Sequence, residues 1–273
     1  MSALRSNDLA QLAEGARALA SKASLAIMEV YQRSYTVTAK ADDSPLTEAD
    51  LTAHAILEHG LKALEPRFPV LSEESSARIF VDRKRWLRYW LIDPLDGTRE
   101  FVQRNGEFAV NIALIEDGVP VIGIIAEPRL ARMGCGVRGL GAALYQADGS
   151  NQVLRTVPHA QPLRIGMSRS HHPAELERSL SLLGDREPVV LGSSLKFLSI
   201  AEGNMDLYPR LRSSSSEWDI AAGQGLLEAA GGAVLGLDGA PLRYNQRDSL
   251  TMPAFVAFGD PSQDWLARLG WHA

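Results

Sequence analysis

Two carboxylates three residues apart follow a short apolar run, and a pair at this spacing can bind a divalent cation. The run at 89–92 is strand-like, and the segment Asp-Pro-Leu-Asp-Gly-Thr at 93–98 comes directly after it. Pro94 restricts Asp93 to an extended conformation, and Gly97 permits a tight turn. Carboxylates this close repel each other unless a cation lies between them, and Mg²⁺ prefers oxygen ligands. The segment therefore predicts a divalent-cation site in a turn at the end of a strand, with a helix cap in a tight turn as the alternative.

The residues after this turn can begin a helix at 98–102. The first amide groups of a helix have no partner within it, and they favour an anion such as phosphate. The turn would thus present carboxylates, a hydroxyl and amide donors together.

Other acidic residues stand at the ends of predicted elements. Glu73 and Glu74 follow the strand-like run at 69–71, although such a pair is often part of a solvated loop. Asp50 and Asp219 each stand three residues after a hydroxyl residue at a predicted helix start, which fits a capping box as well as a ligand. The spacing does not separate these alternatives.

The elements that must position these side chains can be read from the apolar periodicity. Apolar residues recur every three or four positions over 9–30 and again over 47–64, where Leu51, Leu57, Leu61 and Leu64 are expected to face inward. Two strand-like runs at 108–115 and 119–126 predict a hairpin. Beyond a boundary at 157–161, strands alternate with helices. The chain is therefore expected to combine α+β and α/β parts in layers.

Composition excludes several classes of protein. Lys and Arg number 28 and Asp and Glu number 33, so the net charge of −5 argues against nucleic-acid binding. One cysteine, Cys135, excludes an internal disulfide, and no run of about 20 apolar residues or signal-peptide core is present. We therefore expect a cytoplasmic protein. The basic segment 78–88 is interpreted as a solvated helix face anchored by Trp86, with peripheral contact to the inner membrane left open.

Four motifs in a fixed order resemble the inositol monophosphatase-like family of Mg²⁺-dependent, lithium-sensitive phosphatases. They are SPLTEAD (44–50), LSEES (71–75), WLIDPLDGT (90–98) and WDIAAG (218–223). The resemblance implies an alternating αβαβα layered sandwich of the sugar-phosphatase type. It also implies an N-terminal α+β domain over 1–157 and a C-terminal α/β domain over 158–273.

Within the family, the segments 99–118 and 192–210 resemble the bacterial 3'(2'),5'-bisphosphate nucleotidases of sulfate assimilation. That resemblance implies hydrolysis of 3'-phosphoadenosine 5'-phosphate to AMP and phosphate, with Mg²⁺ as cofactor. The implied metal ligands are Glu73, Asp93, Asp96, Asp219 and the main-chain carbonyl of Leu95.

The resemblance also assigns roles in catalysis and substrate binding. Asp50 and Thr98 would orient and deprotonate the attacking water, and the amides of Gly97 and Thr98 would hold the scissile phosphate. The implied substrate-binding residues are Glu73, Leu95, Asp96, Gly97, Thr98, His171, Ser193, Lys196, Arg210 and Asp219.

Two alternatives stay open at this point. The same chemistry would serve inositol monophosphate or fructose 1,6-bisphosphate, although Lys196 and Arg210 suit a substrate with a second phosphate. A non-catalytic nucleotide-binding regulator would belong to another class, and the full set of acidic residues argues against it. A homodimer is also left open.

Overall fold

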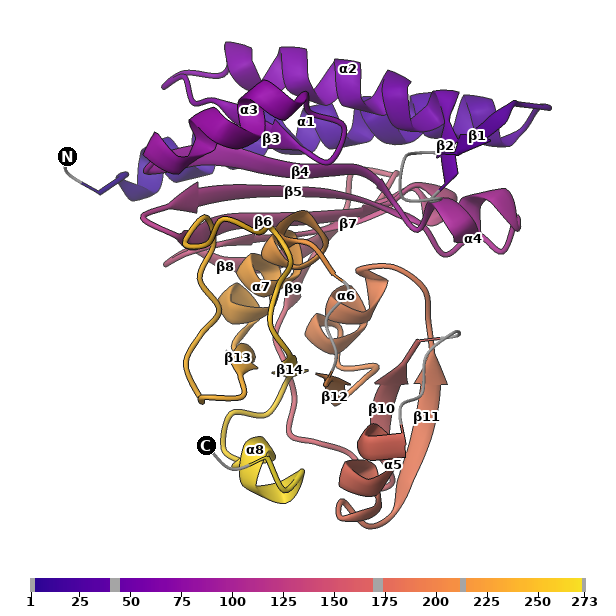
Figure 1. Ribbon diagram of the computed structural model, residues 1–273, viewed down its shortest axis with the longest axis vertical. Helices are drawn as coiled ribbons and strands as arrows, with labels where there is room; N and C mark the ends of the chain where they lie inside the picture. Colours follow the sequence, from indigo (N-terminus) through magenta and orange to yellow (C-terminus); the bar gives the residue numbers. More distant parts are fainter. Residues whose placement is uncertain (1–2, 40–44, 169–173, 212–214, 272–273) are drawn as a thin grey trace.

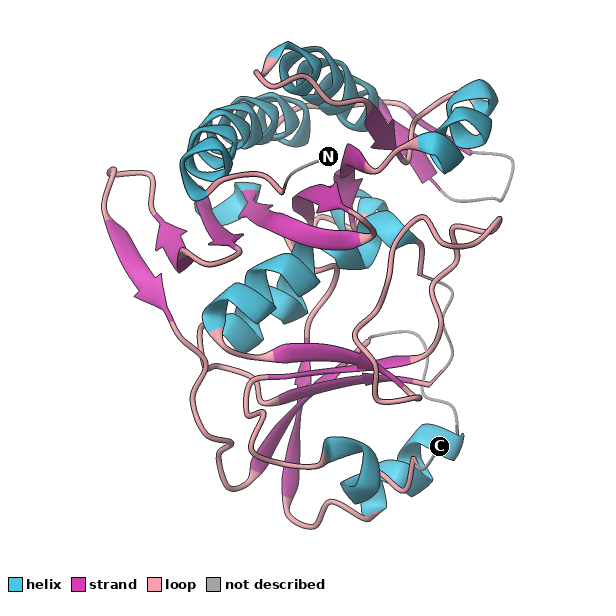
Figure 2. Ribbon diagram, turned by 90° about the vertical axis from the view of Figure 1, so that its left-hand side faces the viewer, coloured by secondary structure: helices cyan, strands magenta, loops and turns pink. Residues whose placement is uncertain are grey.

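Layers of helices and sheets alternate through the molecule. The computed structural model describes residues 3–39, 45–168, 174–211 and 215–271. A layer of helices lies on the larger sheet, a second layer of helices separates it from the smaller sheet, and short helices cover the far side (Figures 1 and 2). This order confirms the predicted αβαβα sandwich.

The first half of the chain builds the outer helices and the larger sheet. Its elements are α1 (Ser6–Tyr31), β1 (Val37–Ala39), β2 (Pro45–Thr47), α2 (Glu48–Ala63), β3 (Val70–Ser72), α3 (Ala77–Asp82), η1 (Arg83–Arg85), β4 (Arg88–Asp96), α4 (Thr98–Val102), β5 (Ala109–Glu116), β6 (Val119–Glu127), η2 (Pro128–Leu130), β7 (Arg132–Val137), β8 (Gly141–Tyr145) and β9 (Asn151–Leu154). The larger sheet has the strand order β3-β4-β5-β6-β7-β8-β9.

The second half builds the inner helices and the smaller sheet. Its elements are β10 (Leu163–Met167), α5 (Ala174–Ser181), β11 (Arg186–Val190), α6 (Leu195–Ala201), β12 (Leu207–Arg210), α7 (Glu217–Ala230), β13 (Ala233–Gly236), β14 (Phe255–Phe258) and α8 (Trp265–Arg268). The strand order is β11-β10-β12-β14-β13, in which β11, β10 and β12 run parallel. The alternation of strands and helices predicted from the sequence is confirmed here.

Helices α1 and α2 pack on each other through small and apolar side chains. The buried face of α2 includes Ala49, Asp50, Ala53 and Leu57. Leu51 was expected on this face, but half of its surface is exposed (51%). The prediction was wrong because the face follows the phase of Asp50, and the next residue is turned by about 100° away from it.

Strand β5 lies near the centre of the larger sheet and is buried along its whole length. Alternate side chains point to opposite faces of a strand. Val110, Ile112 and Leu114 accordingly join the core under α1 and α2, whereas Ala109 and Ala113 join the core around α6 and α7. The strand is mostly apolar because helices cover both of its faces, and Asn111 and Glu116 are its polar residues.

The end of β4 differs from the sequence prediction. The predicted turn at 93–98 is largely part of the strand, which continues to Asp96. Asp93 pairs with Asn111 and Asp96 pairs with Ala109, so one extra residue lies on β4 and forms a bulge. Pro94 lies within the bulge, where a residue without an amide proton is tolerated.

The basic segment 78–88 also differs from its prediction. Arg83 is almost fully buried (1% exposed), and it donates to Asn245 Oδ1 at 2.5 Å and to the Asp248 carbonyl at 2.6 Å. The interpretation as a solvated helix face fails at this residue, because a loop from the second half of the chain covers it.

Helix α7 lies between the two sheets, and glycines allow its close approach to the larger one. A Cβ atom at Gly123 of β6 would lie 2.2 Å from the carbonyl oxygen of Ala222 and 2.5 Å from the amide nitrogen of Leu226, both in α7. Only glycine fits between these backbones without a shift. The distance between β6 and α7 therefore depends on the missing side chain.

The larger sheet ends at Leu154 and the smaller one begins at Leu163. One cluster of buried residues draws on both halves, so a domain boundary at 157 remains a prediction. Across the described ranges, no helix has the length and apolar character needed to cross a bilayer.

The close approach at Gly123 predicts a specific loss of stability. Gly123→Ala should lower the free energy of unfolding by about 3 kcal/mol, the upper range for overpacking, because the methyl group meets rigid backbone. Urea denaturation measures this change. The control is Gly139→Ala, where the added Cβ meets nothing within 4 Å and only the left-handed φ of 78° costs about 1 kcal/mol. Equal losses in the two variants would contradict the packing argument.

Candidate active site

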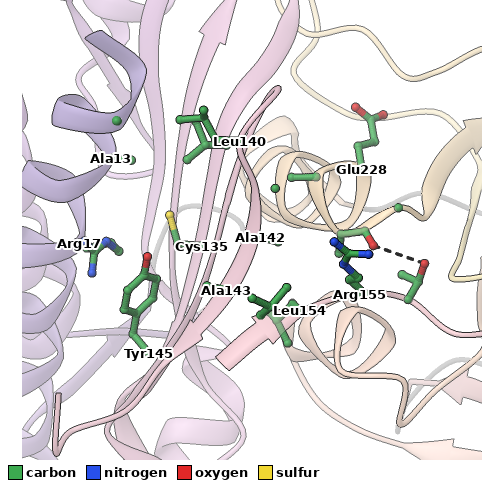
Figure 3. A pocket seen from close by; sticks show the side chains of 18 of the residues that line it. Ala13, Arg17, Cys135, Leu140, Ala142, Ala143, Tyr145, Leu154, Arg155 and Glu228 are labelled. Atoms are coloured by element: carbon green, nitrogen blue, oxygen red, sulfur yellow. Dashed lines mark hydrogen bonds between the residues drawn. The ribbon is translucent and has the colours of Figure 1, made fainter. Parts of the chain in front are cut away.

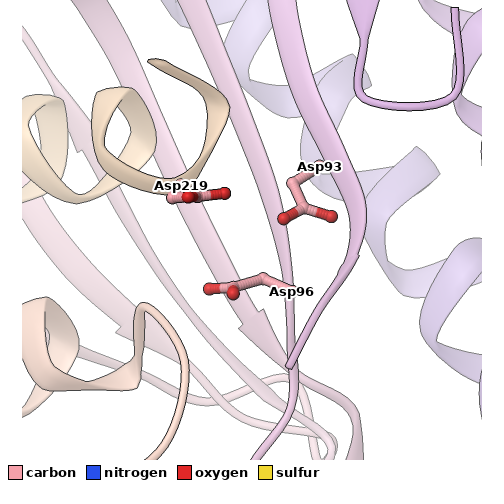
Figure 4. Close-up of side chains that lie close together, drawn as sticks. All are labelled: Asp93, Asp96 and Asp219. Atoms are coloured by element: carbon pink, nitrogen blue, oxygen red, sulfur yellow. The ribbon is translucent and has the colours of Figure 1, made fainter. Parts of the chain in front are cut away.

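Three aspartates from separate parts of the chain form an acidic cluster. Asp93 and Asp96 stand at the end of β4, and Asp219 stands in the first turn of α7. One carboxylate oxygen from each lies within 4.8 Å of those of the other two (Figure 4). The cluster therefore joins the larger sheet to the helix layer beneath it.

Glu73 lies beside this cluster because of strand register. Strands β3 and β4 run parallel, with Ser72 opposite Ile92. The residues that follow, Glu73 just after β3 and Asp93 in β4, therefore lie side by side, and the Glu73 amide donates to the Ile92 carbonyl at 3.2 Å. Carboxyl ends of neighbouring parallel strands are a common place for a site.

The electrostatics of the cluster fit a cation. Burial, together with the nearby charges of Glu73, Asp96 and Asp219, raises the pKa of Asp93 well above its ordinary value. Burial and the charges of Asp96 and Glu73 do the same to the pKa of Asp219. A divalent cation would reverse this effect because it favours the charged form of every carboxylate. An all-oxygen donor set of this kind suits Mg²⁺ or Mn²⁺.

Two residues that sequence reasoning missed hold Asp96 in place. The Ser194 amide donates to Asp96 Oδ2 at 2.5 Å, and Asn111 Nδ2 donates to the same oxygen at 3.3 Å. Ser194 Oγ in turn donates to Asn111 Oδ1 at 2.6 Å. A signal existed for Asn111, which is a polar residue inside the apolar run of β5 and is fully buried. No local signal marked Ser194, because its partners are distant in the chain.

Asp50 and Thr98 meet next to the cluster. Thr98 Oγ1 lies 3.1 Å from Asp50 Oδ1 and 3.1 Å from the Leu95 carbonyl oxygen. The other carboxylate oxygen of Asp50 accepts from the Thr47 amide at 2.7 Å and from the Thr47 hydroxyl at 2.6 Å. Burial raises the pKa of Asp50 despite these hydrogen bonds. Asp50 and Thr98 together can therefore accept a proton from a molecule bound beside the Leu95 carbonyl oxygen.

Gly97 connects the acidic strand end to helix α4. Its φ of 89° is in the left-handed region, and a Cβ atom there would lie 3.2 Å from Ser193 Cβ and 3.1 Å from the Glu107 carbonyl. Both the backbone conformation and the space require glycine. The loop that carries Ser193 is also anchored here, since the Gly192 amide donates to Glu107 Oε2 at 2.7 Å.

A cavity of about 160 Å³ opens beside the acidic cluster. Its lining includes Asp96 and Asp219 from the cluster together with Ser193, Lys196 and Arg210 from the second half of the chain. Acidic and basic side chains therefore share one small space.

The two basic side chains in this cavity are held by hydrogen bonds, Lys196 to backbone carbonyls and Arg210 to serine hydroxyls. Lys196 Nζ donates to the carbonyls of Leu191 at 2.8 Å and Ser193 at 2.7 Å, and burial lowers its pKa to about 8. Arg210 donates to Ser168 Oγ at 3.0 Å and to Ser215 Oγ at 3.3 Å. Its buried Nε has no hydrogen-bond partner within the described part of the chain, so the guanidinium can bond further.

The structure brings together nearly all of the residues singled out in the sequence. The acidic group comprises Asp50, Glu73, Asp93, Leu95, Asp96, Gly97, Thr98 and Asp219, and the second group comprises Ser193, Lys196 and Arg210. His171 lies outside the described residues.

A larger cavity of about 850 Å³ lies elsewhere, between α1, strands β7 to β9 and the end of α7 (Figure 3). Its lining includes Arg17, Cys135, Tyr145 and Glu228. Burial raises the pKa of the Cys135 thiol to about 12, so this thiol is a poor nucleophile. The smaller cavity combines carboxylates and cations at close range, and we therefore take it as the candidate active site.

The comparisons with known proteins agree with this geometry. The profile of the Inositol monophosphatase family matches residues 8–263. The chain is 44% identical over 239 residues to "3'(2'),5'-bisphosphate nucleotidase CysQ" of Escherichia coli (strain K12), covering 87% of this chain and 95% of that protein. It is 39% identical over 241 residues to the protein of the same name from Haemophilus influenzae, covering 88% and 89%.

Solved structures show the same fold. CysQ from Bacteroides thetaiotaomicron, described as a bacterial member of the inositol monophosphatase family, superposes with a TM-score of 0.79 at 35% identity, covering 90% of this chain and 96% of that one. An inositol monophosphatase from Zymomonas mobilis superposes with a TM-score of 0.74 at 27% identity, covering 95% and 96%.

The repulsion within the cluster predicts how stability responds to a metal. Mg²⁺ should stabilise the wild type and raise its melting temperature. At a Mg²⁺ concentration of a hundred times Kd, the free energy of unfolding should rise by about 2.7 kcal/mol. Asp93→Asn should abolish this stabilisation while leaving the cation-free protein at least as stable, because one of the repelling charges is gone. Differential scanning calorimetry with and without Mg²⁺ measures both effects. Glu29→Gln, which removes an exposed charge from α1, should respond as the wild type does; a full Mg²⁺ response in Asp93→Asn would contradict the assignment.

Proposed function

The chain belongs to the inositol monophosphatase family, and from this premise we propose that it hydrolyses the 3'-phosphate of 3'-phosphoadenosine 5'-phosphate to AMP and phosphate, with Mg²⁺ as cofactor. The identity with proteins named 3'(2'),5'-bisphosphate nucleotidase over most of both chains supports this substrate.

The observation that carries the proposal is the shared cavity. Asp96 and Asp219 line one part of it, and Lys196 and Arg210 line another. A substrate with two phosphates matches this division, because the cation-binding carboxylates take the phosphate to be cleaved and the basic side chains take the other. Inositol monophosphate has no second phosphate to occupy the basic part.

The metal ligands are proposed from the family resemblance, and the close approach of Asp93, Asp96 and Asp219 supports them. Glu73, Asp93 and the Leu95 carbonyl would hold one Mg²⁺, and Asp93, Asp96 and Asp219 would hold a second. When bound, Mg²⁺ lowers the pKa of water and offsets the negative charge of the phosphate. Asn111 and Ser194 keep Asp96 in its orientation through the hydrogen bonds described above.

The chain's own residues supply the proton transfer. Thr98 donates its hydroxyl proton to Asp50 Oδ1, and its oxygen accepts a proton from the attacking water. Asp50 is fixed for this role because Thr47 occupies its second carboxylate oxygen. Water attacks the phosphorus in line as the bond to the 3'-oxygen breaks, so no phospho-enzyme forms, and the leaving 3'-oxygen takes a proton from solvent. The amides of Gly97 and Thr98 hold the phosphate oxygens on which charge develops.

We also place this activity in the cytoplasm, where removal of 3'-phosphoadenosine 5'-phosphate would serve sulfate assimilation. Peripheral association with the inner membrane and a homodimer stay open within the proposal.

The basic part of the cavity predicts a selective effect of Arg210→Gln. Losing a charged hydrogen bond to the 5'-phosphate costs about 1.5–3 kcal/mol, so kcat/KM for 3'-phosphoadenosine 5'-phosphate should fall about 10- to 150-fold. The value for adenosine 3'-phosphate, which lacks only the 5'-phosphate, should change less than about threefold by the same reasoning. Phosphate release with Mg²⁺ measures both. The control is Arg178→Gln, which removes an exposed arginine of α5 and should leave both kcat/KM values unchanged. A larger wild-type turnover of inositol 1-phosphate would contradict the proposed substrate.

Lithium provides a separate prediction that follows from the resemblance. Phosphate release should be inhibited by millimolar LiCl, and KCl at the same ionic strength should have little effect. A steady-state assay at fixed Mg²⁺ measures this. Equal rates in the two salts would remove lithium sensitivity from the proposal.

A further inference from the structure

One face of α2 carries a line of polar side chains that ends at the active site. Asp50, His54, Glu58 and Lys62 are spaced four residues apart, so each lies next to the following one along the helix surface. Lys62 Nζ lies 2.8 Å from Glu58 Oε1, and Glu58 Oε2 lies 3.6 Å from His54 Nε2. His54 Nδ1 is 2.9 Å from Ser72 Oγ, at the end of β3. The proposed mechanism uses Asp50 but not the other three.

Ser72 fixes the turn that carries Glu73 and Glu74. Its hydroxyl oxygen accepts from the Glu74 amide at 3.2 Å. Its own amide donates to Ser75 Oγ at 2.9 Å, and its carbonyl accepts from the Ser75 amide at 3.0 Å. Ser72 is fully buried, so water cannot replace these bonds. The direction of its hydroxyl therefore affects the whole turn.

His54 sets that direction. A serine hydroxyl has one proton to donate, and the amide of Glu74 already occupies part of its acceptor capacity. The hydrogen bond between His54 Nδ1 and Ser72 Oγ fixes the hydroxyl in either imidazole tautomer. Nδ1 accepts the Ser72 proton when the imidazole proton is on Nε2, and Nδ1 donates to the hydroxyl oxygen when it carries the proton itself.

The turn needs such support because its two carboxylates face others. The charge of Glu73 acts on Asp93 and Asp219, and the charge of Glu74 acts on Asp50; in each case it raises the pKa of the neighbour. Repulsion favours a turn that moves away from the cluster when no cation is bound. The bond from His54 to Ser72 opposes that movement.

We propose that His54 is a positioning residue for divalent-cation binding, and that it acts through Ser72 to hold the turn with Glu73 beside Asp93. This inference rests on the proposed function. His54 is not among the residues that line the cavity, and its side chain reaches the turn through Ser72. Partners that orient metal ligands in this way typically contribute 10- to 100-fold to metal affinity.

The test measures Mn²⁺ binding by electron paramagnetic resonance, without substrate. His54→Ala and Ser72→Ala should each weaken Mn²⁺ binding about 10- to 100-fold. His54→Asn places an amide where Nδ1 lies and should bind Mn²⁺ within about threefold of wild type, whereas His54→Gln reaches only the position of Nε2 and should resemble His54→Ala. His59→Ala, an exposed histidine on the same helix, is the control.

A second readout separates positioning from general damage to the fold. The Mg²⁺ concentration for half-maximal phosphate release should rise in His54→Ala, while kcat at saturating Mg²⁺ should fall less than about threefold if only ligand orientation is lost. The double variant His54→Ala with Ser72→Ala should bind Mn²⁺ no more weakly than either single variant, because both act through one bond.

Four results would overturn the inference. They are unchanged Mn²⁺ binding in His54→Ala, recovery by glutamine but not by asparagine, additive losses in the double variant, and a wild type that binds no Mn²⁺. A wild type that binds Mn²⁺ with the expected pattern of variants, yet leaves 3'-phosphoadenosine 5'-phosphate intact, would support the inference and contradict the proposed substrate alone.

Discussion

The mutual repulsion of closely packed carboxylates is the constraint on which the rest of this structure depends. One carboxylate oxygen each from Asp93, Asp96 and Asp219 lies within 4.8 Å of the other two, and the charge of Glu73 adds to theirs. Such a cluster destabilises the protein unless strong contacts elsewhere hold its parts together. Asp219 stays in place because α7 is packed between the two sheets. The backbone of α7 lies so close to β6 that Gly123 has no room for a side chain. The core thus maintains an arrangement that electrostatics opposes.

The bulge in β4 determines where two of these charges point. Residues three apart on a regular strand face opposite sides of a sheet, so Asp93 and Asp96 would be separated. The extra residue between them restores a common face, as their pairing with Asn111 and Ala109 shows. Pro94 favours this irregularity because it cannot donate to the ladder. The three-residue spacing of the two aspartates and the proline between them therefore both depend on the bulge.

Periodicity predicted the helices and strands, and strand ends pointed to Glu73, Asp93 and Asp96, whereas the αβαβα order and the roles of Asp50 and Asp219 followed from the family resemblance. The capping boxes could not be separated from ligands, and the structure explains why. Asp50 Oδ2 accepts from the Thr47 amide while Oδ1 faces Thr98, and Asp219 Oδ2 accepts from the Ser216 amide at 2.7 Å. One oxygen of each carboxylate caps the helix and the other is left for the site, so a role as helix cap and a role in the site are compatible.

What local patterns could not predict is how the two halves of the chain meet. Ser194 binds Asp96 through its amide, and Lys196, two residues later on α6, enters the same cavity. The start of α6 therefore joins the acidic and basic parts of the site in one rigid element. A shift of α6 that moved the lysine relative to the substrate would also break the hydrogen bond to Asp96. In the proposed function, this short segment would couple substrate binding to metal coordination, because Ser194 and Lys196 are held by the same helix start.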